Sequence, residues 1–300
     1  MGLLDGIGRL MGGENGQERL RLHEDLLTSL LVMAWMVEAR DPYTGGHLWR
    51  VSRFAHLLAA DAGLPASAVA RIAVGGFLHD LGKISVPDHI LGKKDRLTDA
   101  EYAVIKTHPD VGWRMLAGHP LATLAEAAIR AHHETPDGGG YPRGLRGMDV
   151  PSDARIVGIC DAFDAMTSTR PYRRGMPVGK ALEIIEENLD RQFDREFGQR
   201  FLALGRAGQL DHIVGHSDAG IPLRECVMCG PTLVVRRDSR AGDHLYCRSC
   251  SGEYALAQQD GKLTAVPTGR MASPVELEPE ADTALISQVV RESARALLAG

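Results

Sequence analysis

Apolar residues recur at helical spacing through most of the first 200 positions of the chain. The longest run covers residues 18–39, where leucine, methionine, alanine and valine side chains give one broad apolar face. No alternating strand pattern of any length occurs before residue 225. The pattern therefore predicts an all-helical domain in the first two-thirds of the chain. Shorter runs predict helices over residues 66–81, 121–131, 154–165, 180–189 and 194–204.

Two local signals predict where helices begin or end. Asp41 and Pro42 have the form of an N-cap followed by proline in the first turn. We therefore expect a helix from there through residue 58, with His47 one turn inside it.

Thr98 and Glu101 have the spacing of a capping box, which opens a helix toward His108. Because Pro109 follows at once, His108 is predicted to lie near the end of that helix.

The stretch His79-Asp80-Leu81-Gly82-Lys83 places an imidazole, a carboxylate, a glycine and an ammonium within five positions. On a helix, Lys83 lies on the same face as His79, within reach of an anion held by a metal there. These groups suit a metal ion and a phosphate. The stretch alone leaves open an ordinary helix end with a hydrogen-bonded core histidine.

Composition sets broad limits on function. With 300 residues and 44% hydrophobic content, the chain is long enough for a sizeable core. A net charge of −5 argues against a large nucleic-acid-binding surface. The sequence has no apolar run long enough to span a membrane, and its start lacks a basic segment followed by a hydrophobic block. We expect a cytoplasmic protein.

Further metal-competent residues lie at or near predicted helix boundaries. Each alone is more often structural, since buried histidines usually only find hydrogen bonds. Together with His79 and Asp80, however, they favour a metal centre. They are His47, His108, His132, His133 and Asp161.

The joint pattern resembles the HD-GYP family, the subset of HD-type metal phosphohydrolases associated with hydrolysis of cyclic di-GMP. The resemblance covers roughly residues 18–207. The matching segments are RDPYTGGH at 40–47, RV at 50–51, HDLGK at 79–83, PD at 87–88, His108 with Gly112, HHETPDGGGYP at 132–142, ARI at 154–156, DAFDA at 161–165 and RPYR at 170–173.

The resemblance implies a helical bundle that holds two divalent metal ions, iron or manganese, with Asp80 as the bridging carboxylate and a catalytic residue. Two cations about 3.5 to 4 Å apart neutralise a phosphodiester, make a hydroxide at neutral pH and stabilise the leaving oxygen. The metal ligands implied by the resemblance are His47, His79, Asp80, His108, His132, His133 and Asp161.

Lys83 is expected to place a fixed positive charge at a phosphate oxygen, and we predict it as a second catalytic residue that also binds substrate. By resemblance, Gly140 and Tyr141 of the GYP segment contact the nucleotide, with Tyr141 as a stacking partner. Arg170 and Arg173 would contact phosphate or guanine. For residues 170–174 a solvated basic loop is the alternative.

One departure from the family bears on the number of metals. Some members bind a third metal through a glutamate one helical turn before the first histidine, and here that position is Tyr43. Tyrosine is a much poorer ligand, so we predict two metals rather than three. Whether the product is linear pGpG or GMP stays open.

Four cysteines form two closely spaced pairs, Cys226 with Cys229 and Cys247 with Cys250. This spacing predicts a four-cysteine site for one zinc ion in a zinc-ribbon-like module over residues 216–263, with short strands. Because so small a module has little core, metal coordination would supply its folding energy. Redox use of the cysteine pairs is the less favoured alternative. Contact with a protein partner is a further role for the module.

The expected organisation is a flexible tail over residues 1–17, an HD-GYP catalytic domain over 18–215, the zinc-ribbon-like module over 216–263, a proline-rich acidic linker over 264–282 and a last helix over 283–300. The last helix has an apolar side. It either docks on the body or pairs with a second copy to give a homodimer, and the sequence leaves both open.

The leading interpretation is a metal-dependent cyclic di-GMP phosphodiesterase. An HD-type hydrolase of another cyclic nucleotide is one alternative. A non-catalytic receptor or signalling module is another, with the zinc-binding part contacting a protein or nucleic acid. The complete two-metal ligand set and Lys83 favour the enzyme.

Overall fold

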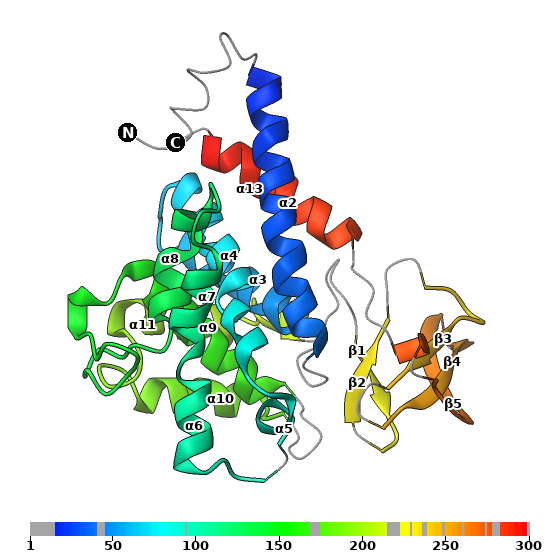
Figure 1. Cartoon of the computed structure of the whole chain (residues 1–300). Coiled ribbons are helices and arrows are strands. Elements are labelled where there is room, and N and C mark those ends of the chain that lie inside the picture. The colour runs from blue at the N-terminus through cyan, green and yellow to red at the C-terminus, as the bar shows by residue number, and fades with distance from the viewer. Residues whose placement is uncertain are drawn as a thin grey trace.

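The computed structural model (Figure 1) shows a helical body, which we define as residues 16–214, and a β module, which we define as residues 223–271. The described residues are 16–40, 46–93, 95–168, 175–214, 223–228, 230–235, 239–247, 250–259, 261–273, 275–277 and 283–298. The body contains α2 (Gly16–Arg40), α3 (His47–Asp61), α4 (Ala66–Leu78), η1 (Leu81–Ser85), α5 (Asp88–Leu91), α6 (Asp99–Ile105), α7 (His108–Met115), α8 (Ala122–Ala131), η2 (Gly147–Asp149), α9 (Ser152–Thr167), α10 (Val178–Glu187), α11 (Arg195–Arg206) and α12 (Asp211–Val214). The β module contains β1 (Leu223–Cys226), β2 (Gly230–Val234), β3 (His244–Tyr246), β4 (Gly252–Gln259) and β5 (Lys262–Met271), and η3 (Val275–Leu277) and α13 (Thr283–Leu298) follow it.

The core of the body surrounds α4, which packs against α3, α8, α9 and α13. Most residues of α4 are buried, as expected for a helix that is apolar on nearly all sides. Beside it, the rings of Phe54, Phe163 and Phe201 meet edge to face with centroids 5.0–6.2 Å apart. The predicted helical fold is confirmed, and α4 carries His79 at its end into the middle of the body.

The start of α3 differs from the prediction. The helix begins at His47, so His47 is its first residue and does not lie one turn inside. The residue before it, Gly46, has a φ of +76°, a left-handed conformation that glycine adopts at little cost and that interrupts a helix. The predicted cap at Asp41 and Pro42 lies outside the described residues.

The capping box is confirmed, because Thr98 accepts from the backbone N–H of Glu101 at the start of α6 while the Glu101 side chain reaches back to Thr98 N. The prediction for His108 is wrong: it begins α7 and does not end a helix. Pro109 lies in the first turn of α7, where its missing N–H has no intrahelical role.

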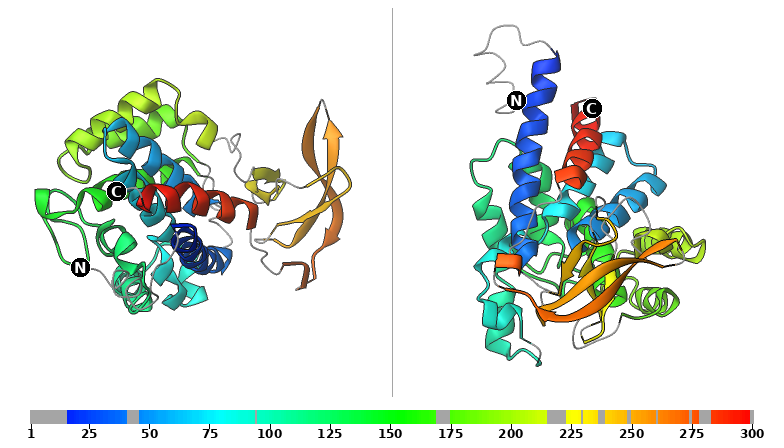
Figure 2. Two further views of the ribbon diagram at one scale, coloured as in Figure 1. Left: turned by 90° about the horizontal axis from the view of Figure 1, so that it is seen from above. Right: turned by 90° about the vertical axis from the view of Figure 1, so that its right-hand side faces the viewer.

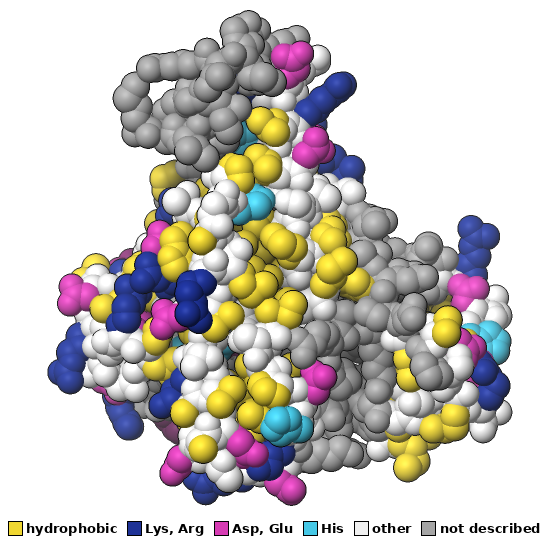
Figure 3. Space-filling view, viewed as in Figure 1, with side chains coloured by type: hydrophobic (Ala, Val, Ile, Leu, Met, Phe, Trp, Pro, Cys, Tyr) yellow, Lys and Arg dark blue, Asp and Glu magenta, His cyan; other side chains and the backbone are white. Residues whose placement is uncertain are grey.

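The last helix docks on its own chain. α13 packs against α2 and α4, and Ile286, Val290 and Ala294 are buried there (Figures 1 and 2). Hydrophobic side chains gather over α2 in the space-filling view (Figure 3). Met33 and Met36 of α2 are exposed. No helix of the described residues is long and apolar enough to cross a membrane.

The β module consists of two small antiparallel sheets, with the strand orders β1-β2 and β3-β4-β5. The prediction of a linker over residues 264–282 is wrong for residues 264–271. These residues belong to strand β5, which pairs with β4. Pro267 had suggested a linker, but β5 lies at the edge of its sheet, where proline is tolerated. At the other end of the chain, α2 begins at Gly16, inside the predicted tail, and residues 1–15 lie outside the described residues.

Candidate metal centre

The predicted metal ligands lie in α3, α7 and α9 and directly after the ends of α4 and α8. Their side-chain donors fall into three overlapping groups, and within each group the ligand atoms lie within 4.8 Å of one another. These groups are His47, His79 and Asp80; His79, His132 and Asp161; and His108, His132 and His133. The structure therefore brings together all seven residues that the sequence singled out, although they are spread over more than 110 positions.

Asp80 lies between two sets of imidazoles. Its Oδ2 atom is 3.5 Å from Nε2 of His47 and 3.4 Å from Nε2 of His79. Its Oδ1 atom is 3.5 Å from Nε2 of His108. Asp161 closes the first set, with Oδ1 3.5 Å from His47 Nε2. One carboxylate facing two ligand sets is the geometry of a bridging ligand between two cations.

Backbone carbonyls fix the orientation of three of the imidazoles. Nδ1 of His79, His108 and His132 each donates to a carbonyl oxygen three or four residues earlier, at 2.7–2.8 Å. In this tautomer each Nε2 carries a lone pair, and Nε2 of His108 lies 3.2 Å from Nε2 of His132. Two acceptors facing each other at this distance fit a cation between or beside them, and the Nδ1–H···O=C contact is the usual support of a metal-bound histidine.

The electrostatics of the centre also suit cations. Burial lowers the pKa of His132 well below its usual range and that of His133 to about 3, so both stay neutral and can bind a metal. Burial alone would raise the pKa of Asp80, but Lys83 and His79 hold it well below its usual range. Burial opposes a charge on His47, yet Asp164 and Asp80 raise the pKa of His47 to about 10. The carboxylates thus draw positive charge into the centre.

Asp164 supports this centre from outside the predicted ligand set. Its Oδ2 accepts from Nδ1 of His47 at 2.8 Å, and its two oxygens also accept from the guanidinium of Arg50. Both Asp164 and Arg50 are buried. The sequence analysis assigned Asp164 no role. Its spacing of three from Asp161, one helical turn, was the signal available.

Three of the predicted substrate residues are described, and they lie beside the centre. The ammonium of Lys83 donates to Asp80 Oδ2. Gly140 passes so close to the backbone of His133 that a Cβ there would collide with the His133 carbonyl oxygen. The ring of Tyr141 stacks on His133, with centroids 4.6 Å apart and an interplanar angle of 24°. Tyr43, Arg170 and Arg173 lie outside the described residues.

A buried glutamate, which sequence reasoning missed, holds the loop that carries Tyr141. Glu134 accepts from the backbone N–H of Arg143 at 2.7 Å and of Leu145 at 2.9 Å. Glu134 lies directly after the two histidines in the HHETPDGGGYP segment. Its hydrogen bonds to the backbone of the loop are visible only in the folded structure. Glu134 therefore ties the Gly140–Pro142 turn to the end of α8.

The β module contains a second cluster of metal-binding type. The Sγ atoms of Cys226, Cys247 and Cys250 lie within 4.8 Å of one another, and Cys229 lies outside the described residues. The Cys226 and Cys250 sulfurs are 3.6 Å apart, too far for a disulfide. Tetrahedral zinc with Zn–S bonds of about 2.3 Å puts its sulfurs about 3.8 Å apart, close to the observed 3.6 Å. The buried Tyr254 hydroxyl donates to Cys226 Sγ at 3.0 Å.

Fold and site together define a helical protein with a buried histidine–carboxylate centre of metal-binding type. Residues 31–197 match the family model described as HD domain, so the chain belongs to the HD domain family. The HD-type family predicted from the motifs is thereby confirmed. HD phosphohydrolases bind divalent metals, and the histidine–aspartate groups are of the kind that does so.

Several curated proteins are similar to this part of the chain. The cyclic di-GMP phosphodiesterase response regulator RpfG of Xanthomonas campestris pv. campestris is 40% identical over 185 residues, which is 61% of this chain and 48% of that protein. A cyclic di-GMP phosphodiesterase of Thermotoga maritima is 35% identical over 64% of this chain and 53% of its own length. The 3'3'-cGAMP-specific phosphodiesterase 3 of Vibrio cholerae is 38% identical over 66% and 43%, respectively. The chain spans about half the length of these relatives.

Proposed function

We propose that this protein is a metal-dependent phosphodiesterase that hydrolyses cyclic di-GMP. The seven histidine and aspartate side chains of the centre would hold two divalent ions, iron or manganese, with Asp80 as the bridging ligand. Curated relatives 35–40% identical are named cyclic di-GMP phosphodiesterases, and they support this substrate.

The observation that carries the proposal is the pair of Nε2 atoms that face each other at 3.2 Å on His108 and His132. Both rings are buried, both are locked by Nδ1 hydrogen bonds, and both have a lowered pKa, first of all through burial. Protonation is therefore a poor way to relieve the contact between the two lone pairs. A bound cation relieves it.

Divalent ions bound here would supply Lewis acidity and lower the pKa of a coordinated water. The protein's own part is to place charge around the phosphodiester. Asp80 spans both ligand sets, and Lys83 lies beside it at the rim with its ammonium partly exposed. We assign Lys83 to a phosphate oxygen of the substrate, whose negative charge it would offset. Tyr141, whose ring stacks on His133, would be a stacking partner for a base.

A second candidate substrate is 3'3'-cGAMP, because a relative 38% identical is named for it. A non-catalytic receptor is disfavoured, since the clustered donors include every ligand expected for two metals. A panel of cyclic dinucleotides assayed with Mn(II) and Fe(II) separates these functions. A receptor would bind without turnover, whereas either enzyme would release linear product.

The test replaces ligands one at a time and measures metal content and hydrolysis on the same sample. We expect His79→Ala and Asp80→Ala to lose bound metal and to lower kcat/KM for cyclic di-GMP at least about 1000-fold, because both remove contacts to the proposed ions. Circular dichroism should still report a folded helical body. Retained activity in both variants would contradict the mechanism, and three metals in the helical body would contradict the two-metal assignment.

For the β module we propose one structural zinc ion held by Cys226, Cys229, Cys247 and Cys250. The spacing of the described sulfurs supports this assignment. The hydroxyl of Tyr254, which donates to Cys226, would stabilise the thiolate form of that ligand.

A further inference from the structure

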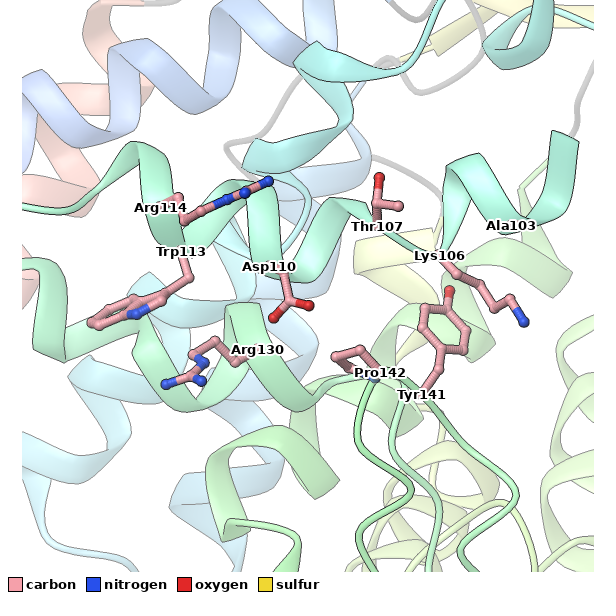
Figure 4. A pocket seen from close by; sticks show the side chains of 9 residues that line it. All are labelled: Ala103, Lys106, Thr107, Asp110, Trp113, Arg114, Arg130, Tyr141 and Pro142. Carbon is pink, nitrogen blue, oxygen red and sulfur yellow. The ribbon is translucent and has the colours of Figure 1, made fainter. Parts of the chain in front are cut away.

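A cavity of about 620 Å³ lies beside the metal centre, between α6, α7, the end of α8 and the Tyr141–Pro142 turn (Figure 4). Its volume is typical of small-molecule sites. None of the seven proposed metal ligands lines it. Tyr141 connects the two places, because its ring stacks on His133 and also forms part of the cavity wall. A ligand whose phosphate lies at the metals can therefore reach the cavity past Tyr141.

The walls of the cavity offer flat surfaces to a planar ring. At one end the guanidinium of Arg130 lies over the indole of Trp113, 5.6 Å from the ring centroid. At the other end are Tyr141 and Pro142. Aromatic rings and guanidinium planes are the surfaces on which proteins stack nucleobases. The shape of the site thus favours a base.

The charges that line the cavity favour a base over a phosphate as its ligand. Lys106, Arg114 and Arg130 line it and by themselves would suit a phosphate. The carboxylate of Asp110, however, lies between the Trp113–Arg130 pair and the Tyr141–Pro142 turn (Figure 4). The side chain of Asp110 makes no hydrogen bond or ion pair with any residue that the structure describes. A carboxylate in that position repels a phosphate and is ready to accept from N–H donors.

We propose that this cavity is a guanine-binding subsite in which Asp110 accepts hydrogen bonds from N1–H and the N2 amino group of the base. The two parallel donors of guanine match the two oxygens of one carboxylate. Adenine presents a lone pair at N1, which the carboxylate would repel, so the site selects guanine by attraction and by repulsion. This inference rests on the proposed function, because it assigns part of the same substrate.

A single guanine subsite has a consequence for mixed cyclic dinucleotides. In 3'3'-cGAMP only the guanine fits the cavity, so the cyclic dinucleotide binds in one orientation. The same phosphodiester bond of the two would then lie at the metals in every molecule. We therefore expect 3'3'-cGAMP to be opened to a single linear isomer. Cyclic di-GMP and 3'3'-cGAMP should be accepted, with kcat/KM for cyclic di-AMP about 10- to 100-fold lower.

The experiment measures kcat/KM for cyclic di-GMP and cyclic di-AMP, and their affinities by calorimetry after the catalytic metals are removed with chelator. The variant is Asp110→Asn. An asparagine amide accepts from adenine N6 and donates to adenine N1, so the guanine-to-adenine ratio should fall about 10-fold or more, with cyclic di-AMP gaining. Asp149→Asn is the matched control, because Asp149 is exposed and outside the cavity. It should keep the wild-type ratio.

The outcomes distinguish this inference from the proposed function. Hydrolysis of bis(p-nitrophenyl) phosphate, which has no base, tests the metal centre alone. If wild-type protein hydrolyses it but treats cyclic di-GMP and cyclic di-AMP alike, or if Asp110→Asn keeps the wild-type ratio, the guanine subsite is wrong and the phosphodiesterase stands. Two linear isomers from 3'3'-cGAMP in equal amounts would also overturn the subsite. If no diester is hydrolysed, the calorimetric ratio still decides the subsite.

Discussion

The helical body and the β module each hold a cluster of metal-binding side chains. The two clusters differ in whether their residues are also part of the hydrophobic core. The body and α13 together hold one cluster of 42 buried hydrophobic residues among those described, and none of them is a proposed ligand. In the β module the corresponding cluster has seven described members, and two of these are the cysteines Cys226 and Cys247. The body thus has a core that is separate from its site, whereas the module has a core that includes its site.

This difference indicates what each metal would do. In the body, the packing of α3, α4, α7, α8 and α9 and the Nδ1 hydrogen bonds orient the histidines. Side chains held in this way by packing and supporting hydrogen bonds are suited to a catalytic site. In the module, the buried apolar cluster is small, so coordination of the proposed zinc ion would contribute a large part of the folding free energy. On our proposal, a metal would therefore serve catalysis in the helical body and folding in the β module.

The largest expected effect comes from breaking the cysteine cluster. Cys247→Ser should remove the zinc ion and unfold residues 223–271, because structural zinc contributes about 10–16 kcal/mol of apparent binding free energy. The helical body should stay folded. Zinc content together with hydrogen exchange of both regions checks this prediction.

Cys160→Ala is the control, since Cys160 is a thiol buried in α9 of the body and far in sequence from the cluster. It should keep zinc and protection in the β module. If the module of Cys247→Ser kept its protection without zinc, the contrast between the two regions would not hold.

The next effect in size concerns how the body holds its site. Asp164→Asn should destabilise the body by roughly 3 kcal/mol, because the guanidinium of Arg50 would stay buried without its carboxylate. It should also lower metal affinity about 10- to 100-fold, since His47 loses the acceptor that orients it. Thermal unfolding and metal titration of the purified variant measure the two effects separately.

Asp153→Asn is a matched control on the same helix. Asp153 also accepts two hydrogen bonds from an arginine, Arg71, but the Arg71 side chain is 40% exposed. Its loss should cost about 1 kcal/mol or less and leave metal affinity unchanged. Equal effects of the two substitutions on metal affinity would mean that Asp164 does not position His47.

The sequence predicted the body better than the β module, for a physical reason. Helices such as α8, α10 and α11 bury one face and expose the other, so their periodicity is visible along the chain. Strand β5 is an edge strand with mostly exposed residues and a proline, and its pattern therefore could not be told from a linker.

The site was also predictable only in part. The ligands stood out because histidine and aspartate motifs recur in a family order. Proline is common both in the first turn of a helix and just after a helix end. Pro109 alone therefore did not show whether a helix begins or ends at His108. The role of Asp164 depends on a contact with His47, 117 positions away, and the cavity depends on packing of α7 against α8. The only local signal for Asp164 was its spacing of one helical turn from Asp161, and the cavity has no local signal.

The smallest expected effect concerns α6. This helix has no buried residue, so it depends on individual polar contacts, much as the β module would depend on its metal ligands. Glu101 accepts from Lys93 and from Thr98, which lower its pKa from 4.5 to about 2. Since the pKa is lower in the folded state, this stabilisation is present above about pH 4.5 and is lost as the pH falls toward 2.

Glu101→Gln should speed amide exchange of α6 at pH 7, after correction for intrinsic rates, and the difference from wild type should vanish near pH 2. Glu183→Gln, which removes the exposed partner of Lys180 on α10, should leave α6 unchanged. A Glu101→Gln difference that persists at pH 2 would mean that α6 is held by packing, as the rest of the body is, and not by its cap.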